Sequence, residues 1–245
     1  MFENTTILIT GAASGIGLAT AQALADQGAK HLILVDRNAG ALDGAEIAGK
    51  VTRLAGDVGD EAFWRTAELG PIDHAVINAG VSGVGLIADL DFAEWRRVLA
   101  VNLDGAFLTL RAALRAIRDG GSIVAVASAA GHKAEPGVGA YAASKAGLIQ
   151  LARVAAKEGA PRGVRVNAIA PGGVETPIWD AVPMFADHAQ EIGRDAAFAE
   201  MAGYATPLKR YAKPEEIAGQ VAFLLSDACA SVTGSVFTVD GGYTL

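Results

Sequence analysis

The N-terminal segment contains a short strand, a glycine-rich turn and the start of a helix in direct succession. The run Thr5–Thr10 is rich in β-branched residues and is typical of a strand. It leads into Gly11, Gly15 and Gly17, and an apolar pattern of helical period follows. Glycines let a backbone approach a pyrophosphate closely, and a helix start offers unpaired N–H groups and a positive dipole end. This order predicts a dinucleotide site, with a turn that binds no ligand as the alternative.

The second predicted strand, His31–Asp36, ends in a carboxylate about 20 residues beyond the glycine turn. A carboxylate there can accept hydrogen bonds from both ribose hydroxyls of adenosine and repels a 2′-phosphate, which favours NAD over NADP. Arg37 follows directly, and its guanidinium could compensate that charge. Aspartate is also a common turn residue at a strand end. The sequence therefore predicts NAD as the cofactor and leaves NADP use through Arg37 open.

A tyrosine and a lysine, Tyr141 and Lys145, lie at positions i and i+4 of a predicted helix. At this spacing two side chains share one helix face, about 5–6 Å apart at Cβ. A nearby ammonium favours the phenolate. A tyrosine with an ordinary pKa of about 10 needs roughly 4 kcal/mol of such help to exchange protons near neutral pH. The pair predicts an acid/base site, with an exposed pair of no function as the alternative.

These motifs occur in an order and spacing that resemble the short-chain dehydrogenase/reductase family over essentially the whole chain. The matching segments are Thr10–Gly17, Asn78-Ala79-Gly80, Asn102, Ser128, Tyr141 with Lys145, and Pro171–Thr176. The family often has two asparagines before Ala-Gly, and Ile77 stands in place of the first. The resemblance implies hydride transfer between NAD(H) and a secondary alcohol or ketone.

The resemblance also implies a catalytic tetrad of Asn102, Ser128, Tyr141 and Lys145. Ser128 would bond the substrate oxygen, and Tyr141 would exchange its proton. Lys145 would hold the nicotinamide ribose and keep Tyr141 anionic, while Asn102 would brace a water that links Lys145 to solvent. Without the resemblance, Ser128 is a strand-end turn residue, and Asn102, an unfavourable residue in mid-helix, marks a kink.

The residues expected to bind the cofactor lie at the carboxyl ends of predicted strands, where ligands gather in parallel sheets. They are Gly11, Ser14, Gly15, Ile16, Gly17, Asp36, Arg37, Asp57, Val58, Asn78, Ala79, Gly80, Tyr141, Lys145, Pro171, Gly172, Val174 and Thr176. By the resemblance, Asp57 contacts the adenine and the turn at 172–176 holds the nicotinamide end. A plain Pro-Gly turn is the alternative there. No metal site is predicted.

Strands and helices alternate along the chain, which predicts a single-domain Rossmann-type α/β fold over residues 1–245. This is a doubly wound parallel seven-stranded sheet with helices on both faces. Long helices are expected over about 92–118 and 140–159, and the fifth strand over 121–128.

The segment 176–206 breaks this alternation and is expected to be a substrate lid, with a peripheral packing helix as the alternative. Its apolar residues suggest a substrate with an apolar or aromatic substituent. The expected substrate contacts are Ser128, Ala130, Trp179, Met184 and Phe185. His132, Lys133 and Glu135, just beyond Ser128, are expected at the rim of the pocket.

Composition limits the classes of partner. The net charge of −7 and the pI near 5.1 argue against nucleic acid or an anionic membrane. The chain shows no basic region followed by an apolar one at its start, and no apolar run approaches about 18 residues. A cytoplasmic protein with a small-molecule substrate is therefore expected. The single Cys229 cannot form an internal disulfide and is expected to be a buried packing thiol.

Two other functions stay open. One is an NADPH-dependent 3-oxoacyl-[acyl-carrier-protein] reductase of the same family; Asp36 opposes it, and such members tend to have arginine where Ser14 and Ser122 stand. The other is an NAD-binding sensor or scaffold without turnover, a class that commonly lacks the tyrosine or lysine.

The two long helices are rich in small and apolar residues, which together with the resemblance predicts a homotetramer, or else a dimer. The substrate, its stereochemistry and the physiological direction stay open.

Overall fold

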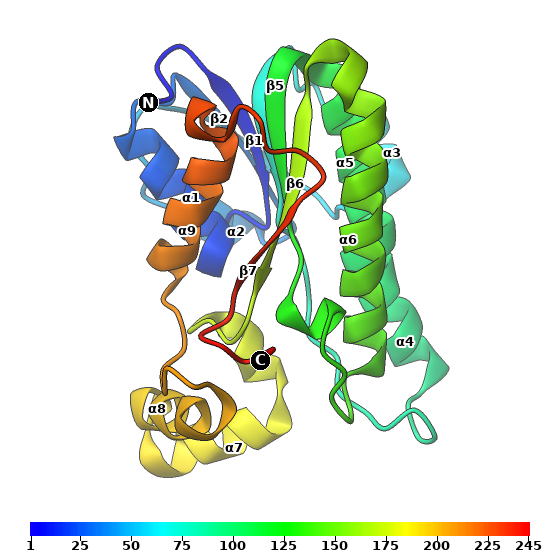
Figure 1. Ribbon diagram of the computed structural model, residues 1–245, viewed down its shortest axis with the longest axis vertical. Helices are drawn as coiled ribbons and strands as arrows, with labels where there is room; N and C mark the ends of the chain where they lie inside the picture. Colours follow the sequence, from blue (N-terminus) through cyan, green and yellow to red (C-terminus); the bar gives the residue numbers. More distant parts are fainter.

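A parallel sheet of seven strands forms the middle layer of the computed structural model, which describes residues 1–245 (Figure 1). The strands are β1 (Thr6–Thr10), β2 (His31–Asp36), β3 (Lys50–Ala55), β4 (Ile72–Ile77), β5 (Ile117–Val126), β6 (Arg165–Pro171) and β7 (Val236–Val239). Their order is β3-β2-β1-β4-β5-β6-β7, and every neighbouring pair is parallel. The strand order reverses between β1 and β4, which is where such sheets bind ligands.

Helices cover both faces of this sheet (Figure 1). On one face lie α1 (Gly15–Asp26), α2 (Ala39–Asp43) and α9 (Pro214–Leu225), and on the other lie α3 (Glu61–Thr66), α4 (Phe92–Leu99), α5 (Ala106–Ala116) and α6 (Gly139–Gly159). The predicted doubly wound α/β fold with one seven-stranded sheet is confirmed.

The strands read as continuous apolar runs because both faces of the sheet are covered. Alternate side chains enter two different cores. Leu8 and Ile33 pack on the side of α5 and α6, while Ile7 and Ile9 pack on the side of α1 and α9. All four are 0–1% exposed. This packing holds the carboxyl ends of the strands in a fixed row, along which the site is built.

The helix expected over 92–118 is interrupted. A π-helical segment at Ala100–Gly105 separates α4 from α5, and it contains Asn102. Single π turns within helices are rare and occur often at functional sites. The fifth strand begins earlier than expected, at Ile117, because that residue has an extended backbone and is buried opposite Ile72. The other long helix, α6, matches its prediction.

Between β6 and α9 the chain forms a helical excursion, residues 176–206, beyond the carboxyl ends of the strands (Figure 1, bottom). Its elements are a 3-10 turn (Pro177–Ala181), α7 (Pro183–Ile192) and α8 (Arg194–Ala205). Aromatic rings give it a core of its own, with the centroids of Phe185 and Phe198 4.4 Å apart. The excursion is thus a packed unit beside the ligand-binding edge.

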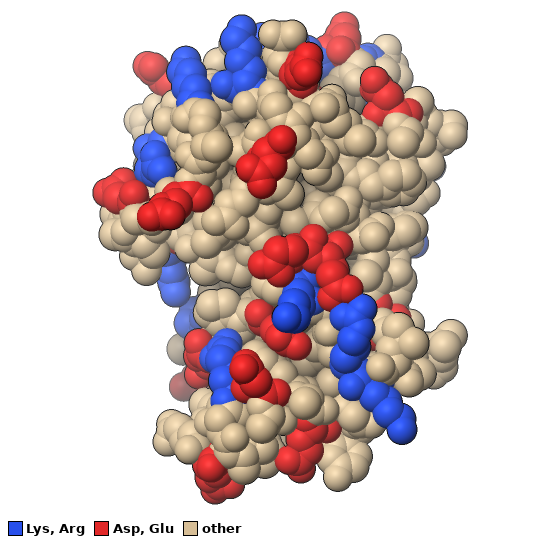
Figure 2. Space-filling view, turned by 90° about the vertical axis from the view of Figure 1, so that its left-hand side faces the viewer, with Lys and Arg blue, Asp and Glu red and all other residues tan.

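The surface mixes charges of both signs. On the face shown in Figure 2, acidic and basic side chains are interspersed with neutral ones, and no extended basic area is visible. None of the helices combines the length and apolar character required to cross a bilayer. Cys229 is a free thiol and is buried, as expected.

Candidate active site

A cavity of about 990 Å³ lies along the carboxyl ends of the strands, bounded on its outer side by the excursion. Its walls come from the glycine turn, the ends of β2, β4, β5 and β6, the start of α6 and the excursion. Of the site residues predicted from sequence, all line this cavity except Gly17, Asn102 and Phe185. The fold therefore brings together motifs that lie far apart along the chain.

Tyr141 and Lys145 lie in the first two turns of α6, on the face that points into the cavity. The Lys145 Nζ atom is 5.7 Å from the centre of the Tyr141 ring and donates a hydrogen bond to the carbonyl oxygen of Val126 at 3.0 Å. Lys145 is only 3% exposed. Because a buried ammonium loses its hydration, burial lowers the pKa of Lys145 to about 8.

Tyr141 and Ser128 both line the cavity. Burial raises the pKa of Tyr141, and Ser128 acts in the opposite direction. The protein groups alone therefore do not hold a phenolate at neutral pH, contrary to the expectation from spacing, because desolvation disfavours the phenolate as well as the ammonium. The Ser128 hydroxyl also accepts the N–H of Ala130 at 3.2 Å, so it caps a turn while facing the tyrosine.

Asn102 lies behind the cavity wall and is completely buried. Its Oδ1 atom accepts the N–H of Val81 at 2.8 Å, and its Nδ2 atom donates to the Val81 carbonyl at 2.9 Å and to Ser144 Oγ at 3.2 Å. The Ser144 hydroxyl in turn donates to the carbonyl of Tyr141 at 2.7 Å. Asn102 therefore ties the segment after β4 to the first turns of α6.

Gly80 provides the space between Asn102 and Lys145. A Cβ atom at Gly80 would lie 3.3 Å from Lys145 Nζ and 3.4 Å from Asn102 Oδ1. The carboxamide and the ammonium therefore approach the same small volume, although no direct hydrogen bond joins them. A water placed between them would meet polar atoms on both sides.

The turn between β1 and α1 fits a pyrophosphate. Gly11 has φ +65°, and a Cβ at Gly17 would lie 2.0 Å from the Gly11 carbonyl oxygen, so neither position accepts a side chain. Ser14 makes no side-chain cap, and the first-turn N–H groups of α1 have no intrahelical partner. Asn78 Nδ2 donates to the carbonyls of Thr10 and Gly11 at 2.9 and 3.1 Å, which braces the turn against β4. Such open amides favour an anion.

The carboxylate of Asp36 lines the same end of the cavity. Its Oδ2 atom accepts the N–H of Ala13 at 3.0 Å, and its Oδ1 atom accepts the N–H of Asn38 at 2.9 Å. These bonds orient the carboxylate and leave each oxygen able to accept one more donor. Arg37 is exposed, lines the cavity and forms no ion pair. Ribose hydroxyls fit this group of residues.

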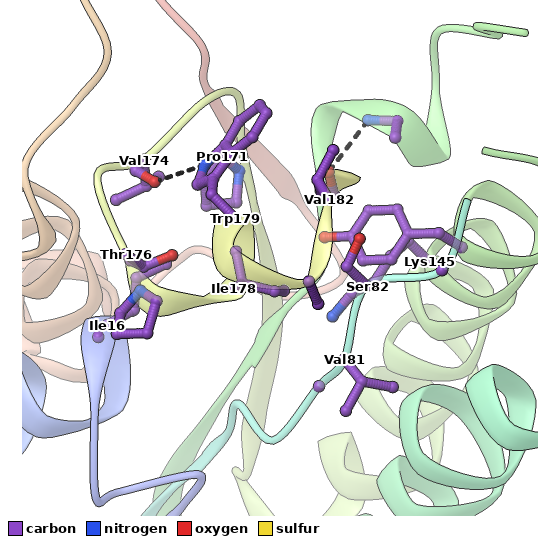
Figure 3. Close-up of a pocket in the computed structure, with 18 of the residues that line it drawn as sticks. Ile16, Val81, Ser82, Lys145, Pro171, Val174, Thr176, Ile178, Trp179 and Val182 are labelled. Atoms are coloured by element: carbon purple, nitrogen blue, oxygen red, sulfur yellow. Dashed lines mark hydrogen bonds between the residues drawn. The ribbon is translucent and has the colours of Figure 1, made fainter. Parts of the chain in front are cut away.

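The excursion supplies an apolar wall at the other end. Figure 3 shows it passing over the cavity, with Thr176, Ile178 and Val182 along it and Ser82 and Lys145 on neighbouring segments. Hydrophobic side chains make up 22 of the 45 residues that line the whole cavity. An apolar substituent can therefore be buried beside the tyrosine and lysine.

Of the excursion residues predicted to contact substrate, Trp179 and Met184 line the cavity and Phe185 does not. Trp179 is held by a hydrogen bond from Nε1 to the Val174 carbonyl at 2.9 Å (Figure 3). Phe185 is fully buried against Phe198 inside the excursion. Consecutive helical residues point about 100° apart. Met184 therefore lies on the exposed side of the excursion, at the cavity, while Phe185 points into the core of the excursion. The predicted contact of Phe185 with substrate is not supported.

Some residues that line the cavity could not be predicted from any pattern in the sequence. Tyr243, two residues before Leu245, is one of them, since the glycine pair before it indicates only a turn. The segment after β4, at Val81–Val84, is another. Glu135, expected at the rim, does line the cavity.

Comparison with known proteins agrees with this geometry. A family model described as enoyl-(acyl carrier protein) reductase matches residues 11–244. The cis-4-hydroxycyclohexanecarboxylate dehydrogenase of Sinomonas cyclohexanicum is 40% identical in sequence, with 99% of this chain and 98% of that protein covered. The chain belongs to the short-chain dehydrogenase/reductase family.

Other relatives of this short-chain dehydrogenase/reductase include reductases named for substrates attached to an acyl carrier protein. The 3-oxoacyl-[acyl-carrier-protein] reductase of Thermotoga maritima is 38% identical, with 99% of both chains covered. The crystal structure of levodione reductase matches with a TM-score of 0.89, 37% identity and 98% of both chains covered. The protein is thus an oxidoreductase of a family that binds a nicotinamide cofactor.

Proposed function

We propose that this protein interconverts a secondary alcohol and a ketone with NAD(H), within one catalytic domain that spans residues 1–245. The observation that carries the proposal is the group of Ser128, Tyr141 and Lys145 at the cavity floor, in which Ser128 and Lys145 are buried and Tyr141 is partly buried. The ammonium lies 5.7 Å from the tyrosine ring centre, and Ser128 lines the same part of the cavity and lowers the pKa of Tyr141. A sensor without turnover has no need to bury an ionisable pair in this way, since burial of each group opposes its charged form.

The protein's residues divide the proton chemistry among them. Ser128 hydrogen-bonds the substrate oxygen, and the Tyr141 phenolic oxygen takes the hydroxyl proton during oxidation and returns it during reduction. Lys145 holds the nicotinamide ribose and stabilises the phenolate. Bound oxidised nicotinamide supplies the acceptor for the hydride that leaves the same carbon. Asn102 braces a water that passes the proton from Lys145 toward solvent.

The cofactor preference rests on Asp36. Its carboxylate is fixed by two backbone N–H groups, at 3.0 and 2.9 Å, so it cannot easily turn away from a 2′-phosphate. Like charges in that position disfavour NADP(H). Arg37 is the group that would favour it. The second candidate is therefore an NADPH-dependent 3-oxoacyl carrier-protein reductase, supported by the unpaired Arg37 and by the relative from Thermotoga maritima.

We further propose that the excursion at 176–206 is the substrate lid. Its start, at Thr176, lies close to the glycine turn, because a Cβ atom added at Gly15 would lie 3.2 Å from the Thr176 side chain. Ala130, Trp179 and Met184 would surround an apolar or aromatic substituent. This arrangement links cofactor and substrate through one segment.

We also propose a homotetramer. Two exposed apolar side chains, Phe107 of α5 and Val154 of α6, are each 45% exposed on one side of the molecule. A second pair, Phe223 of α9 and Phe237 of β7, has ring centroids 6.4 Å apart and is 42% and 39% exposed. Two separate apolar surfaces suit a closed assembly with two kinds of interface.

The deciding experiment is a panel of secondary alcohols and ketones, assayed with both cofactors at the absorbance band of the reduced nicotinamide. Turnover of an apolar cyclic or aromatic alcohol with NAD⁺, absent in Tyr141→Phe, is the expected result. Reduction of 3-oxoacyl carrier thioesters alone, with NADPH, would establish the second candidate. Tight cofactor binding without turnover of any compound would refute both.

A further inference from the structure

A polar rim closes the outer end of the cavity, made by the loop after β5 and the C-terminal tail. The C-terminus lies beside the excursion at the ligand-binding edge of the sheet (Figure 1). Glu135 and Tyr243 both line the cavity. The Tyr243 hydroxyl donates to Glu135 Oε1 at 3.0 Å, which joins two segments 108 residues apart. At the rim, therefore, the Glu135 carboxylate accepts a hydrogen bond from the Tyr243 phenol.

Lys133 holds this pair from outside the cavity. Its Nζ atom donates to the carbonyl oxygen of Tyr243 at 2.8 Å and lies 4.0 Å from the centre of the Tyr243 ring. It also lies 3.5 Å from Glu135 Oε1. Lys133 does not line the cavity, and no protein donor contacts Glu135 Oε2. Lys133 therefore pairs with one oxygen of Glu135 from outside the cavity, and the other oxygen has no protein donor.

Lys133 offsets part of the Glu135 charge from outside the cavity, and Tyr243 supplies no positive charge on the cavity side. Burial and the neighbouring carboxylate raise the pKa of Tyr243, so its hydroxyl stays protonated, and its proton is committed to Glu135. A substrate group that approaches the rim meets an acceptor rather than a donor. Neutral groups that donate hydrogen bonds, and apolar groups, can be accommodated there.

No free cation lies near the substrate end. Arg97 lines the cavity, but its guanidinium donates to both carboxylate oxygens of Glu94 at 2.7 Å and to the Ser82 carbonyl at 2.6 Å. Contact with Glu94 raises the pKa of Arg97 and balances its charge. Lys145 belongs to the catalytic group. An anionic substrate end would therefore find no unpaired counter-charge at the rim.

We infer that Glu135 is a specificity-determining residue, which selects substrates with a neutral far end and excludes those with a carboxylate or another anion there. The inference rests on the proposed function, because it places the substrate between Tyr141 and the rim. Repulsion between two like charges about 6 Å apart lowers the affinity roughly threefold at the dielectric of water. At an effective dielectric near 20 it lowers the affinity about a hundredfold. A partly open rim lies between these limits, so we expect discrimination of about tenfold.

The test compares a matched pair of ketones, 4-oxocyclohexanecarboxylate and its uncharged methyl ester. In the wild-type protein kcat/KM should favour the ester by about tenfold. In Glu135→Gln the value for the carboxylate should rise about tenfold, and that for the ester should change less than about twofold. The matched control is Glu158→Gln, which removes one charge from an exposed position near the far end of α6 and should alter neither value. An unchanged ratio in Glu135→Gln would overturn the inference.

A binding measurement separates this inference from the proposed function. In a Tyr141→Phe background, the two ketones are titrated into the protein with reduced cofactor, and binding is read as quenching of tryptophan fluorescence, since Trp179 lines the cavity. If the protein with Tyr141 intact turned over neither ketone, while binding in the Tyr141→Phe background still discriminated through Glu135, the proposed function would be refuted and the rim assignment supported. Equal binding of both ketones, or no binding of the ester, would overturn the rim assignment whatever the turnover.

Discussion

Replacing Lys145 with methionine should stabilise the free protein while it abolishes catalysis. Burial lowers the pKa of Lys145 from its ordinary 10.5 to about 8. Since one pKa unit corresponds to about 1.4 kcal/mol, burying the ammonium costs about 3 kcal/mol at neutral pH. Methionine has a similar unbranched shape and avoids that cost. It loses the hydrogen bond to the Val126 carbonyl, worth about 1 kcal/mol, so Lys145→Met should gain about 2 kcal/mol.

The sign of the pH dependence follows from the same shift. Below about pH 8 the lysine is protonated in both the folded and the unfolded protein, and the full cost of burial is present. Between about pH 8 and 10.5 the folded protein has released a proton that the unfolded chain still binds, so the stability of the wild-type protein rises with pH. The advantage of Lys145→Met should therefore shrink above pH 8 and vanish near pH 10.

The assay is urea unfolding of the cofactor-free protein at pH 7 and pH 10, at one protein concentration. The free energy of unfolding at pH 7 should rise by about 2 kcal/mol. In a thermal scan the same gain corresponds to a rise in Tm of roughly 4–8 °C for a domain of this size. Lys157→Met is the matched control, because Lys157 is an exposed residue of the same helix and has no buried charge to remove. A Lys145→Met protein that is less stable than wild type at pH 7, or an advantage that is equal at both pH values, would refute the reasoning.

The remaining predictions concern catalysis, cofactor and assembly. Tyr141→Phe should lower kcat by about 10²–10⁴ with little change in cofactor affinity, since it removes only the proton-exchanging hydroxyl; a variant that keeps a tenth of the turnover would exclude Tyr141 as the acid/base. Wild-type oxidation should rise with pH through the apparent pKa of the coupled Tyr141–Lys145 pair, and a flat profile of kcat/KM would contradict this. Asp36→Ser should shift the ratio of kcat/KM from NAD toward NADP; a wild-type preference for NADP would instead implicate Arg37 as the phosphate partner. Light scattering at micromolar concentration should report about four times the 24.9 kDa chain mass, and a particle of one chain mass would reject the homotetramer.

Much of the site could be predicted because its requirements are local. The glycine turn needs φ +65° at Gly11 and no side chain at Gly17, and these demands are met by residue type within one short segment. The spacing of Tyr141 and Lys145 on one helix face is likewise a property of helical geometry. The apolar runs of the strands follow from a sheet covered on both faces.

Features that depend on distant partners could not be predicted. The π-helical segment at Ala100–Gly105 forms where Asn102 bonds Val81, 21 positions earlier in the chain. A helical pattern in the sequence does not distinguish hydrogen bonds to the fourth preceding residue from those to the fifth. Met184 and Phe185 are adjacent apolar residues, and only the core built around Phe198 shows which of them faces inward.

The residue types along the chain were sufficient to predict the parallel α/β layout, the glycine turn and the Tyr141–Lys145 pair, because each is specified by periodicity or by short-range geometry. The ionisation of that pair and the character of the rim came from the folded structure. Burial raises the pKa of Tyr141 and lowers that of Lys145, and burial is produced by side chains from the entire fold. The contact of Tyr243 with Glu135 spans 108 positions, a distance over which no local pattern carries information.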